Sequence, residues 1–238
     1  MFVILIRHGE TDYNKEGIVQ GNEVDPPLNE CGERQAIETG KFIKDKFNFD
    51  VVYSSPLKRT MKTTELILEN IKIKKRNIIK NEGLLEQSKG IFSGLKKQEI
   101  KDVINNNPKL LHLYKKIKEN SKSDLESLLF IYSKTYAEYN KLVNQEGWPE
   151  LEDRSIKVFN EIVKSNFGKN ILIISHGSFI SALVRKLFNT RDVKQSTIKT
   201  NNKKSGNCTI TVIEIDENNN KELILSFNNL HLTHLYEE

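Results

Sequence analysis

The chain has 238 residues, of which 37% are hydrophobic and 29% charged, a composition typical of one globular domain with a sizeable core. The 37 Lys and Arg residues outnumber the 32 Asp and Glu residues, which gives a formal net charge of +5. The apolar run Met1–Ile6 is too short for a membrane span or a secretory signal, and the densest basic run, residues 72–80, has no interleaved aromatic side chains, so we expect neither a membrane protein nor a nucleic-acid-binding module.

The first part of the chain alternates predicted strands and helices. Its apolar runs are short and rich in β-branched residues, which indicates buried strands. Asn29 can cap a helix through its side chain, and Pro56 suits the first position of another because it has no N–H to leave unpaired. The elements expected in order are a strand at Phe2–Ile6, a loop at Arg7–Pro27, a helix from Asn29 to about Lys46, a strand at Val51–Ser54, a helix from Ser55-Pro56 to about Asn70 and a short strand at Ile78–Ile79.

The middle of the chain differs in character from its flanks. It is rich in Lys, Asn and Leu, and no arginine occurs between Asn77 and Asp153. Apolar residues at helical spacing, such as Leu110, Leu113 and Ile117, indicate two or three helices. We therefore expect a helical cap at about residues 96–147, inserted into a single domain that spans residues 1–238.

The last part of the chain returns to alternating strands and helices, and it ends in a predicted hairpin. The expected elements are a helix at Glu150–Phe167, a buried strand at Asn170–Ser175, a helix from about Ser178 to Phe188, a polar loop at Thr190–Ser205, and strands at Thr209–Ile215 and Glu222–Phe227. This order predicts a three-layer α/β/α fold with a mostly parallel central sheet and a helical cap insertion.

Two histidines, His8 and His176, each follow the carboxyl end of a predicted buried strand. Ligands of open α/β sheets bind at that edge, so the two side chains are expected to converge on one pocket. A neutral imidazole is a competent nucleophile towards a phosphate ester, and the planar guanidinium groups of Arg7 and Arg59 suit phosphoryl oxygens. The leaving alkoxide needs a proton, which a carboxylic acid can supply.

Three motifs, each after a predicted strand, carry a resemblance to a known family. They are Arg7-His8-Gly9-Glu10-Thr11 with Asn14, then Ser54-Ser55-Pro56-Leu57-Lys58-Arg59-Thr60, then Ser175-His176-Gly177. Together with Gln20-Gly21 in the first loop, they resemble the histidine phosphatase superfamily, which is also called phosphoglycerate mutase-like. The resemblance covers most of the chain and implies the three-layer fold of that superfamily.

The resemblance also implies roles for individual residues. His8 would form a phosphohistidine, and Arg7, Arg59 and His176 would hold the phosphoryl group. Leu84-Leu85-Glu86-Gln87-Ser88-Lys89-Gly90 fits the pattern around the superfamily's acid, which nominates Glu86. The expected substrate-binding residues are Asn14, Gln20, Gly21 and Gly177.

Within the superfamily, phosphatase and mutase activities compete. Cofactor-dependent phosphoglycerate mutases typically carry an arginine after the acid and a pair of arginines in the inserted helices, whereas this chain has Gln87 and an arginine-free cap. The nucleophile loop is similar to that of TIGAR-type fructose-2,6-bisphosphatases, so we expect a phosphatase acting on fructose 2,6-bisphosphate or other glycolytic phosphates. The alternatives are a cofactor-dependent phosphoglycerate mutase and a phospho-ligand-binding pseudoenzyme.

The cysteines and the C-terminal histidines bear on metal binding and on the cellular compartment. Cys31 and Cys208 lie far apart and belong to no metal-binding pattern, so neither a disulfide nor a metal site is expected, and a cytoplasmic location fits best. His231 and His234 are assigned a surface or subsite role, because two histidines without a third ligand make a weak metal site. The expected partner is a small phosphorylated metabolite, with no cofactor, no nucleic acid and no membrane.

Overall fold

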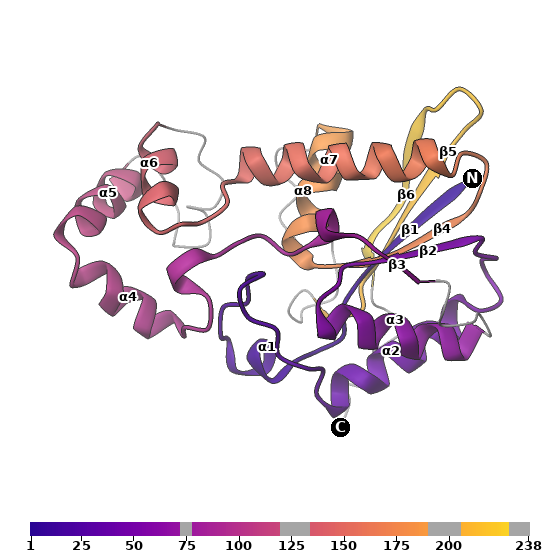
Figure 1. Ribbon diagram of the computed structural model, residues 1–238, viewed down its shortest axis with the longest axis horizontal. Helices are drawn as coiled ribbons and strands as arrows, with labels where there is room; N and C mark the ends of the chain where they lie inside the picture. Colours follow the sequence, from indigo (N-terminus) through magenta and orange to yellow (C-terminus); the bar gives the residue numbers. More distant parts are fainter. Residues whose placement is uncertain (72–77, 120–133, 190–205, 229–238) are drawn as a thin grey trace.

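A six-stranded sheet forms the centre of the computed structural model, which describes residues 1–71, 78–119, 134–189 and 206–228 (Figure 1). The strand order is β3-β2-β4-β1-β5-β6, where the pairings among β3, β2, β4 and β1 are parallel and those of β1 with β5 and of β5 with β6 are antiparallel. The strands are β1 (Phe2–Arg7), β2 (Val51–Ser54), β3 (Ile78–Lys80), β4 (Ile171–Ser175), β5 (Ile210–Ile215) and β6 (Lys221–Asn228). His231 and His234 lie outside the described residues.

Helices cover both faces of this sheet. Side chains alternate along a strand, so Val3 and Leu5 of β1 pack with α7 (Trp148–Ser165) and α8 (Gly177–Phe188). Ile4 and Ile6 face the other way and pack with α2 (Glu30–Ile43) and α3 (Lys58–Ile71). Each such side chain, when fully buried, stabilises the fold by roughly 1.5–3 kcal/mol. The predicted three-layer, mostly parallel α/β fold is confirmed, and Figure 1 shows the two helical layers on opposite sides of the strands.

The predicted start of α2 agrees with the structure, and the predicted start of α3 does not. Asn29 caps α2 as predicted, and its side-chain oxygen accepts a hydrogen bond from the Gly32 N–H at 2.8 Å. The prediction that Pro56 begins α3 is wrong, because the helix begins at Lys58. The Asp25 carboxylate, from a distant loop, accepts a hydrogen bond from the Lys58 N–H at 2.8 Å. This contact caps the helix at Lys58, two residues after Pro56.

The segment after β1 that was predicted to be a loop contains a short helix, α1 (Asp12–Glu16). Thr11 and Asn14 form a reciprocal capping box at its start, and Gly17 ends it with a φ of 70°, a left-handed conformation that glycine adopts without a steric penalty. Five residues are too few to show a helical period, which is why the pattern indicated a loop.

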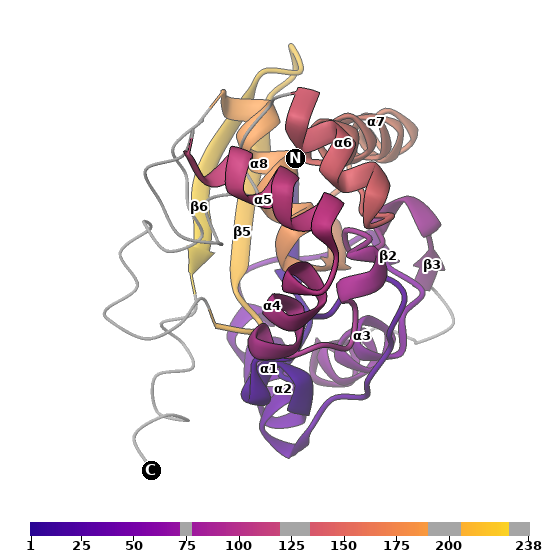
Figure 2. The ribbon, with the colours of Figure 1, turned by 90° about the vertical axis from the view of Figure 1, so that its left-hand side faces the viewer.

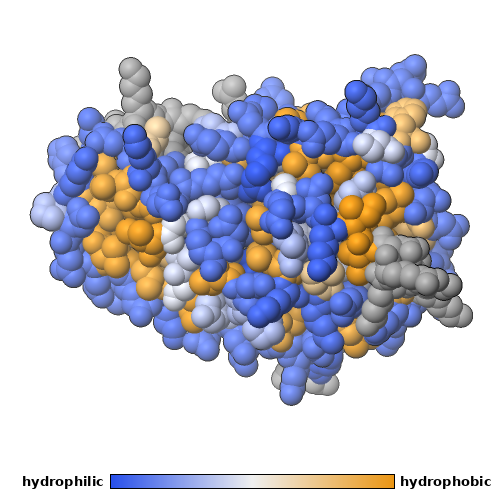
Figure 3. Space-filling model, viewed as in Figure 1, coloured by the Kyte–Doolittle hydropathy of each residue, from blue (hydrophilic) through white to orange (hydrophobic). Residues whose placement is uncertain are grey.

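The segment predicted to be a cap contains three helices, α4 (Lys97–Asn105), α5 (Pro108–Glu119) and α6 (Lys134–Leu142). They lie together at one end of the molecule (Figures 1 and 2), and apolar surface also gathers at this end (Figure 3). Their buried apolar residues form a cluster distinct from the two clusters on the sheet. The short 3-10 helices η2 (Glu82–Leu84) and η3 (Gly90–Phe92) lie in the chain before them. Insertion of this unit into a single domain stays a prediction.

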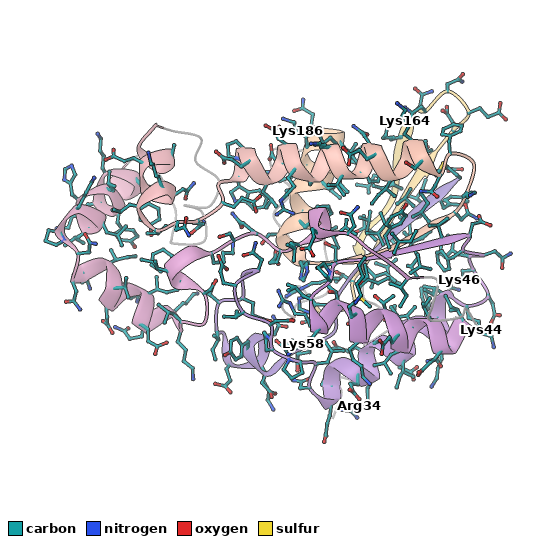
Figure 4. The ribbon with its side chains drawn as sticks, viewed as in Figure 1. Arg34, Lys44, Lys46, Lys58, Lys164 and Lys186 are labelled. Atoms are coloured by element: carbon teal, nitrogen blue, oxygen red, sulfur yellow. The ribbon has the colours of Figure 1, made fainter. Side chains whose placement is uncertain are left out.

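Basic side chains are distributed over several elements. The six that Figure 4 labels are all exposed, and they come from α2, α3, α7, α8 and the turn after α2. Positive charge at these positions is therefore spread over the surface. Among the described residues, no helix combines the length and the apolar character needed to cross a membrane.

Candidate active site

The two histidines meet because their strands are neighbours. β1 and β4 are parallel and paired in register, with Arg7 opposite Ser175, and the His8 N–H donates to the Ser175 carbonyl at 3.0 Å. The chain therefore leaves both strands at the same edge, and the rings of His8 and His176 lie 5.3 Å apart between centroids, inclined by 60°. Both side chains are buried.

The loop backbone fixes the orientation of the His8 ring. Its Nδ1 lies 2.7 Å from the Gly9 carbonyl oxygen, and since a carbonyl can only accept, Nδ1 must carry the proton. Nε2 then keeps its lone pair, which is the form a nucleophile needs. The Asn207 amide group lies within 3.1 Å of both the His8 and the Gly9 carbonyl oxygens, and it also approaches the Asn14 Oδ1 at 3.0 Å.

Arg59 lies on α3 and is completely buried. Its two terminal nitrogens donate to the carbonyls of Val24 and Gly21 at 2.9 and 3.0 Å, and the Asp25 carboxylate lies 3.5 Å away. Its Nε has no hydrogen-bond partner among the residues that the structure describes. A buried donor in this state suits an incoming anion.

His176 is held from the neighbouring strand. Its Nε2 lies 2.8 Å from the Ser55 hydroxyl, directly after β2, whereas its buried Nδ1 has no hydrogen-bond partner within the described part of the chain. His176 is also the N-cap residue of α8, and Gly177 is the first residue of that helix. The positive end of the helix dipole at an N-terminus favours a negatively charged ligand.

Burial and nearby charge keep both imidazoles neutral. Burial lowers the pKa of His8 well below its ordinary value, the charges of Arg59 and Arg7 lower it further, and the hydrogen bond to Gly9 opposes them. The pKa of His176 is lowered for the same reasons, burial first and then Arg59 and His8. Arg7, the residue before His8, also lowers the pKa of both imidazoles through its positive charge. The site combines two neutral imidazoles with two guanidinium groups, an arrangement suited to a phosphoryl dianion.

Glu86 is buried in the loop between η2 and η3. Its Oε1 accepts from the Gln87 N–H at 2.8 Å, and its Oε2 lies 3.4 Å from the Ser178 N–H in the first turn of α8. The preceding backbone is held by Arg154, which donates to the carbonyls of Gly83 and Leu85 at 2.8 and 2.9 Å. The loop therefore brings this carboxylate next to the helix that His176 caps.

The remaining predicted residues surround the nucleophile loop. The Thr11 hydroxyl lies 3.1 Å from both the Asn14 Oδ1 and the Gln20 Oε1, so these two side chains adjoin. Gly21 accepts a hydrogen bond from Arg59 through its carbonyl. The nine residues predicted from the sequence, His8 included, thus come from strand ends, helix starts and loops that meet at one edge of the sheet, and their individual roles stay predictions.

The sequence did not predict the contacts of three further residues at the site, Asn207, Ser55 and Arg154. Asn207 could have been suspected, because β5 runs antiparallel to β1 and its start must lie at the edge where β1 ends. Arg154 offered no comparable signal, since its carbonyl partners lie about 70 residues away in the sequence. Bidentate pairing with Glu146, at 2.7 and 2.8 Å, holds its guanidinium group in place.

Comparison with known proteins adds independent evidence. The profile of the histidine phosphatase superfamily (branch 1) matches residues 3–229. The uncharacterized phosphatase PhoE of Bacillus subtilis is 31% identical over 195 residues, which cover 82% of this chain and 81% of that protein. Fructose-2,6-bisphosphatase TIGAR B of Danio rerio is 29% identical over 192 residues, 77% of this chain and 73% of that protein.

Solved structures give the same result. A mutant phosphoserine phosphatase from Entamoeba histolytica, in complex with phosphoserine, has a TM-score of 0.69 and 25% identity, and the match covers 97% of this chain and 98% of that one. Among the sequence relatives, the 2,3-bisphosphoglycerate-dependent phosphoglycerate mutase of Parvibaculum lavamentivorans is 30% identical over 186 residues, 78% of this chain and 79% of that protein. The comparisons support a phosphatase enzyme, with phosphatase or phosphoglycerate mutase-like activity. The chain belongs to branch 1 of the histidine phosphatase superfamily.

Proposed function

We propose that this chain hydrolyses small phosphate esters through a covalent phosphohistidine at His8, without a metal ion. The observation that carries the proposal is the arrangement around that ring. Its Nδ1 is committed to the Gly9 carbonyl, and two buried nitrogens, the Nε of Arg59 and the Nδ1 of His176, have no partner among the described residues. The Arg59 Nε is a donor, and the His176 Nδ1 is one in the tautomer whose Nε2 accepts from the Ser55 hydroxyl. A phosphoryl group placed against Nε2 of His8 would supply acceptors for both.

The reaction proceeds in two displacements. In the first, Nε2 of His8 attacks phosphorus, the bond from phosphorus to the ester oxygen breaks, and Glu86 donates its proton to the leaving oxygen. In the second, water attacks the phosphohistidine, the nitrogen–phosphorus bond breaks, and the Glu86 carboxylate takes the proton. Inorganic phosphate leaves, and both side chains return to their starting states.

The guanidinium groups of Arg7 and Arg59 stabilise the negative charge of the phosphoryl group. The phosphoryl oxygens gain negative charge in both displacements, and fixed guanidinium groups stabilise that charge without reorganising. Binding of the dianion also opposes the effect of Arg59 and Arg7 on the imidazoles, so the pKa of His176 rises when the site is filled. His176 then becomes a better donor to a phosphoryl oxygen.

The surroundings of Gln87 favour a phosphatase over a mutase. This side chain is fully buried, its Nε2 donates to the Glu146 carbonyl at 2.7 Å, and its Oε1 accepts from the Lys89 ammonium group. The residue that stands where the mutases typically have an arginine is thus committed to internal contacts. It has no charge with which to hold the second anionic end of a phosphoglycerate.

We propose a sugar phosphate as the substrate, with fructose 2,6-bisphosphate and other glycolytic phosphates as the first candidates. The similarity to fructose-2,6-bisphosphatase TIGAR B supports this choice. Phosphoserine and 3-phosphoglyceric acid, which are bound in structures of the Entamoeba histolytica phosphatase, are included for comparison. A phosphate-release screen across these compounds identifies the substrate by its kcat/KM.

Hydrolysis of p-nitrophenyl phosphate in the presence of EDTA tests the activity itself. We expect wild-type turnover to persist in EDTA and His8→Ala to lose nearly all of it, by about 10⁴-fold or more, because the nucleophile is gone. The mutase alternative is tested with 3-phosphoglycerate and a 2,3-bisphosphoglycerate primer. Efficient conversion to 2-phosphoglycerate without net phosphate release would contradict the proposed function.

A further inference from the structure

We propose that Glu23 is a positioning residue whose carboxylate holds the loop that carries Glu86 against the loop that binds Arg59. The inference rests on the proposed function, in which Glu86 protonates the leaving oxygen. The sequence did not indicate a role for Glu23, which is exposed and lies in the loop between α1 and α2.

Both carboxylate oxygens of Glu23 are used by one segment, residues 88–93. Oε1 accepts from the Ser88 hydroxyl and from the Gly90 N–H at 2.8 Å. Oε2 accepts from the Ser93 hydroxyl and from the Lys89 N–H at 3.2 Å. Four donors from a span of six residues thus converge on one side chain that lies about 65 residues away in the sequence.

The backbone on either side of Glu23 performs a second task. The carbonyls of Gly21 and Val24 accept the hydrogen bonds of Arg59. One short loop therefore binds the buried guanidinium group through its main chain and the acid loop through the Glu23 side chain. Glu86 lies only two residues before Ser88, so this arrangement also fixes the distance between Arg59 and Glu86.

Gly21 shows how closely the two loops approach. A Cβ atom at this position would lie 2.1 Å from the Glu23 Oε2, 2.6 Å from the Ser93 hydroxyl oxygen and 2.9 Å from the Lys89 backbone nitrogen. No side chain larger than hydrogen fits there without displacing the contacts of Glu23. The close approach of the two loops therefore explains why this position is a glycine.

The carboxylate is ionised in the pH range where the enzyme is expected to work. Burial acts to raise the pKa of Glu23, but the hydrogen bonds from Ser88 and Ser93, with that from Gly90, outweigh it and the net shift is downward. Hydrogen bonds to an ionised acceptor are stronger than those to a neutral one, which suits a residue that holds a loop.

The test separates positioning of the acid from simple damage to the fold. Phenolate leaving groups such as p-nitrophenolate depart with little help from an acid, whereas alkoxides need a proton. We expect Glu23→Ala to lower kcat/KM for an alkyl or sugar phosphate by at least about tenfold more than for p-nitrophenyl phosphate, since small displacements of a catalytic group are costly. Glu23→Gln keeps one acceptor oxygen and should recover part of the difference.

Three further variants complete the design. Glu86→Ala should show the same dependence on the leaving group and to a larger extent, Ser93→Ala a smaller one, and Glu161→Ala, at an exposed position on α7, none. A Glu23→Ala variant that loses activity equally on both substrates, or not at all, while Glu86→Ala discriminates between them, overturns this inference alone. If Glu86→Ala does not discriminate, the acid assignment in the proposed function fails and the inference fails with it.

Discussion

At the scale of single residues, the nucleophile is prepared by contacts to the main chain. The Gly9 carbonyl accepts from His8 and thereby leaves Nε2 unprotonated. Asn207 in turn approaches the carbonyls of His8 and Gly9, so the acceptor that orients the imidazole is itself held in place. The Thr63 hydroxyl adds a contact from α3, accepting from the Gly9 N–H at 2.9 Å.

Asn207 provides the first test at this scale. Asn207→Ala removes a buried donor shared by three acceptors, so we expect the free energy of unfolding to fall by about 1–3 kcal/mol in urea denaturation. Since the His8 ring loses its support, kcat should fall more than KM rises. Unchanged stability and kcat would show that the contacts in the structure carry little energy.

At the scale of elements, the site depends on close approach of the nucleophile loop to α2. A Cβ on Gly9 would lie 2.4 Å from the Gly32 carbonyl oxygen, and one on Gly32 would lie 2.1 Å from the Glu10 carbonyl oxygen. Both obstacles are backbone atoms, which cannot rotate away as a side chain can. The helix and the loop therefore fit together only with glycine on each side.

Gly32→Ala tests this packing. The added methyl group has to push the nucleophile loop away from α2, so we expect a loss of about 1–3 kcal/mol in stability together with a clear fall in kcat. Glu30→Ala, at an exposed position in the first turn of the same helix, is the control and should change stability by less than about 0.5 kcal/mol. Equal behaviour of the two variants would contradict the account.

Much of this element-scale arrangement could be predicted from the sequence. The apolar runs at β1 and β4 predict buried strands. Histidines that follow two parallel neighbouring strands must meet at one edge of the sheet. The start of α3 and the helix α1 could not be predicted, because the first depends on a carboxylate from another loop, Asp25, and the second is too short for a period. Asn207 and Arg154 were missed for a similar reason, since their partners are distant backbone carbonyls.

At the scale of the whole molecule, two buried neutral histidines make global stability depend on pH. The pKa values of His8 and His176 are lowered in the folded state, whereas unfolding restores them to about 6.5. Below that value the unfolded chain binds more protons than the folded one. Stability is therefore greatest above pH 6.5 and falls as the pH drops towards the lowered pKa values, by up to about 1.4 kcal/mol per pH unit for each histidine.

Urea denaturation between pH 7.5 and 5.5 measures this effect. We expect the free energy of unfolding of the wild type to fall across this interval, and His8→Asn to show a shallower fall because one of the two groups is gone. His112→Asn, at an exposed position on α5, should keep the wild-type dependence. An identical slope in His8→Asn would mean that burial does not hold this imidazole neutral.

The most direct test of the account is to trap the covalent intermediate. A rapid acid-free quench of the enzyme with ³²P-labelled substrate, followed by peptide mapping, detects phosphate attached to histidine, which is labile in acid. We expect the wild-type protein to carry the label on His8 during turnover and the His8→Ala variant to carry none. Turnover without any labelled enzyme, or a label that persists in His8→Ala, would contradict the proposed mechanism.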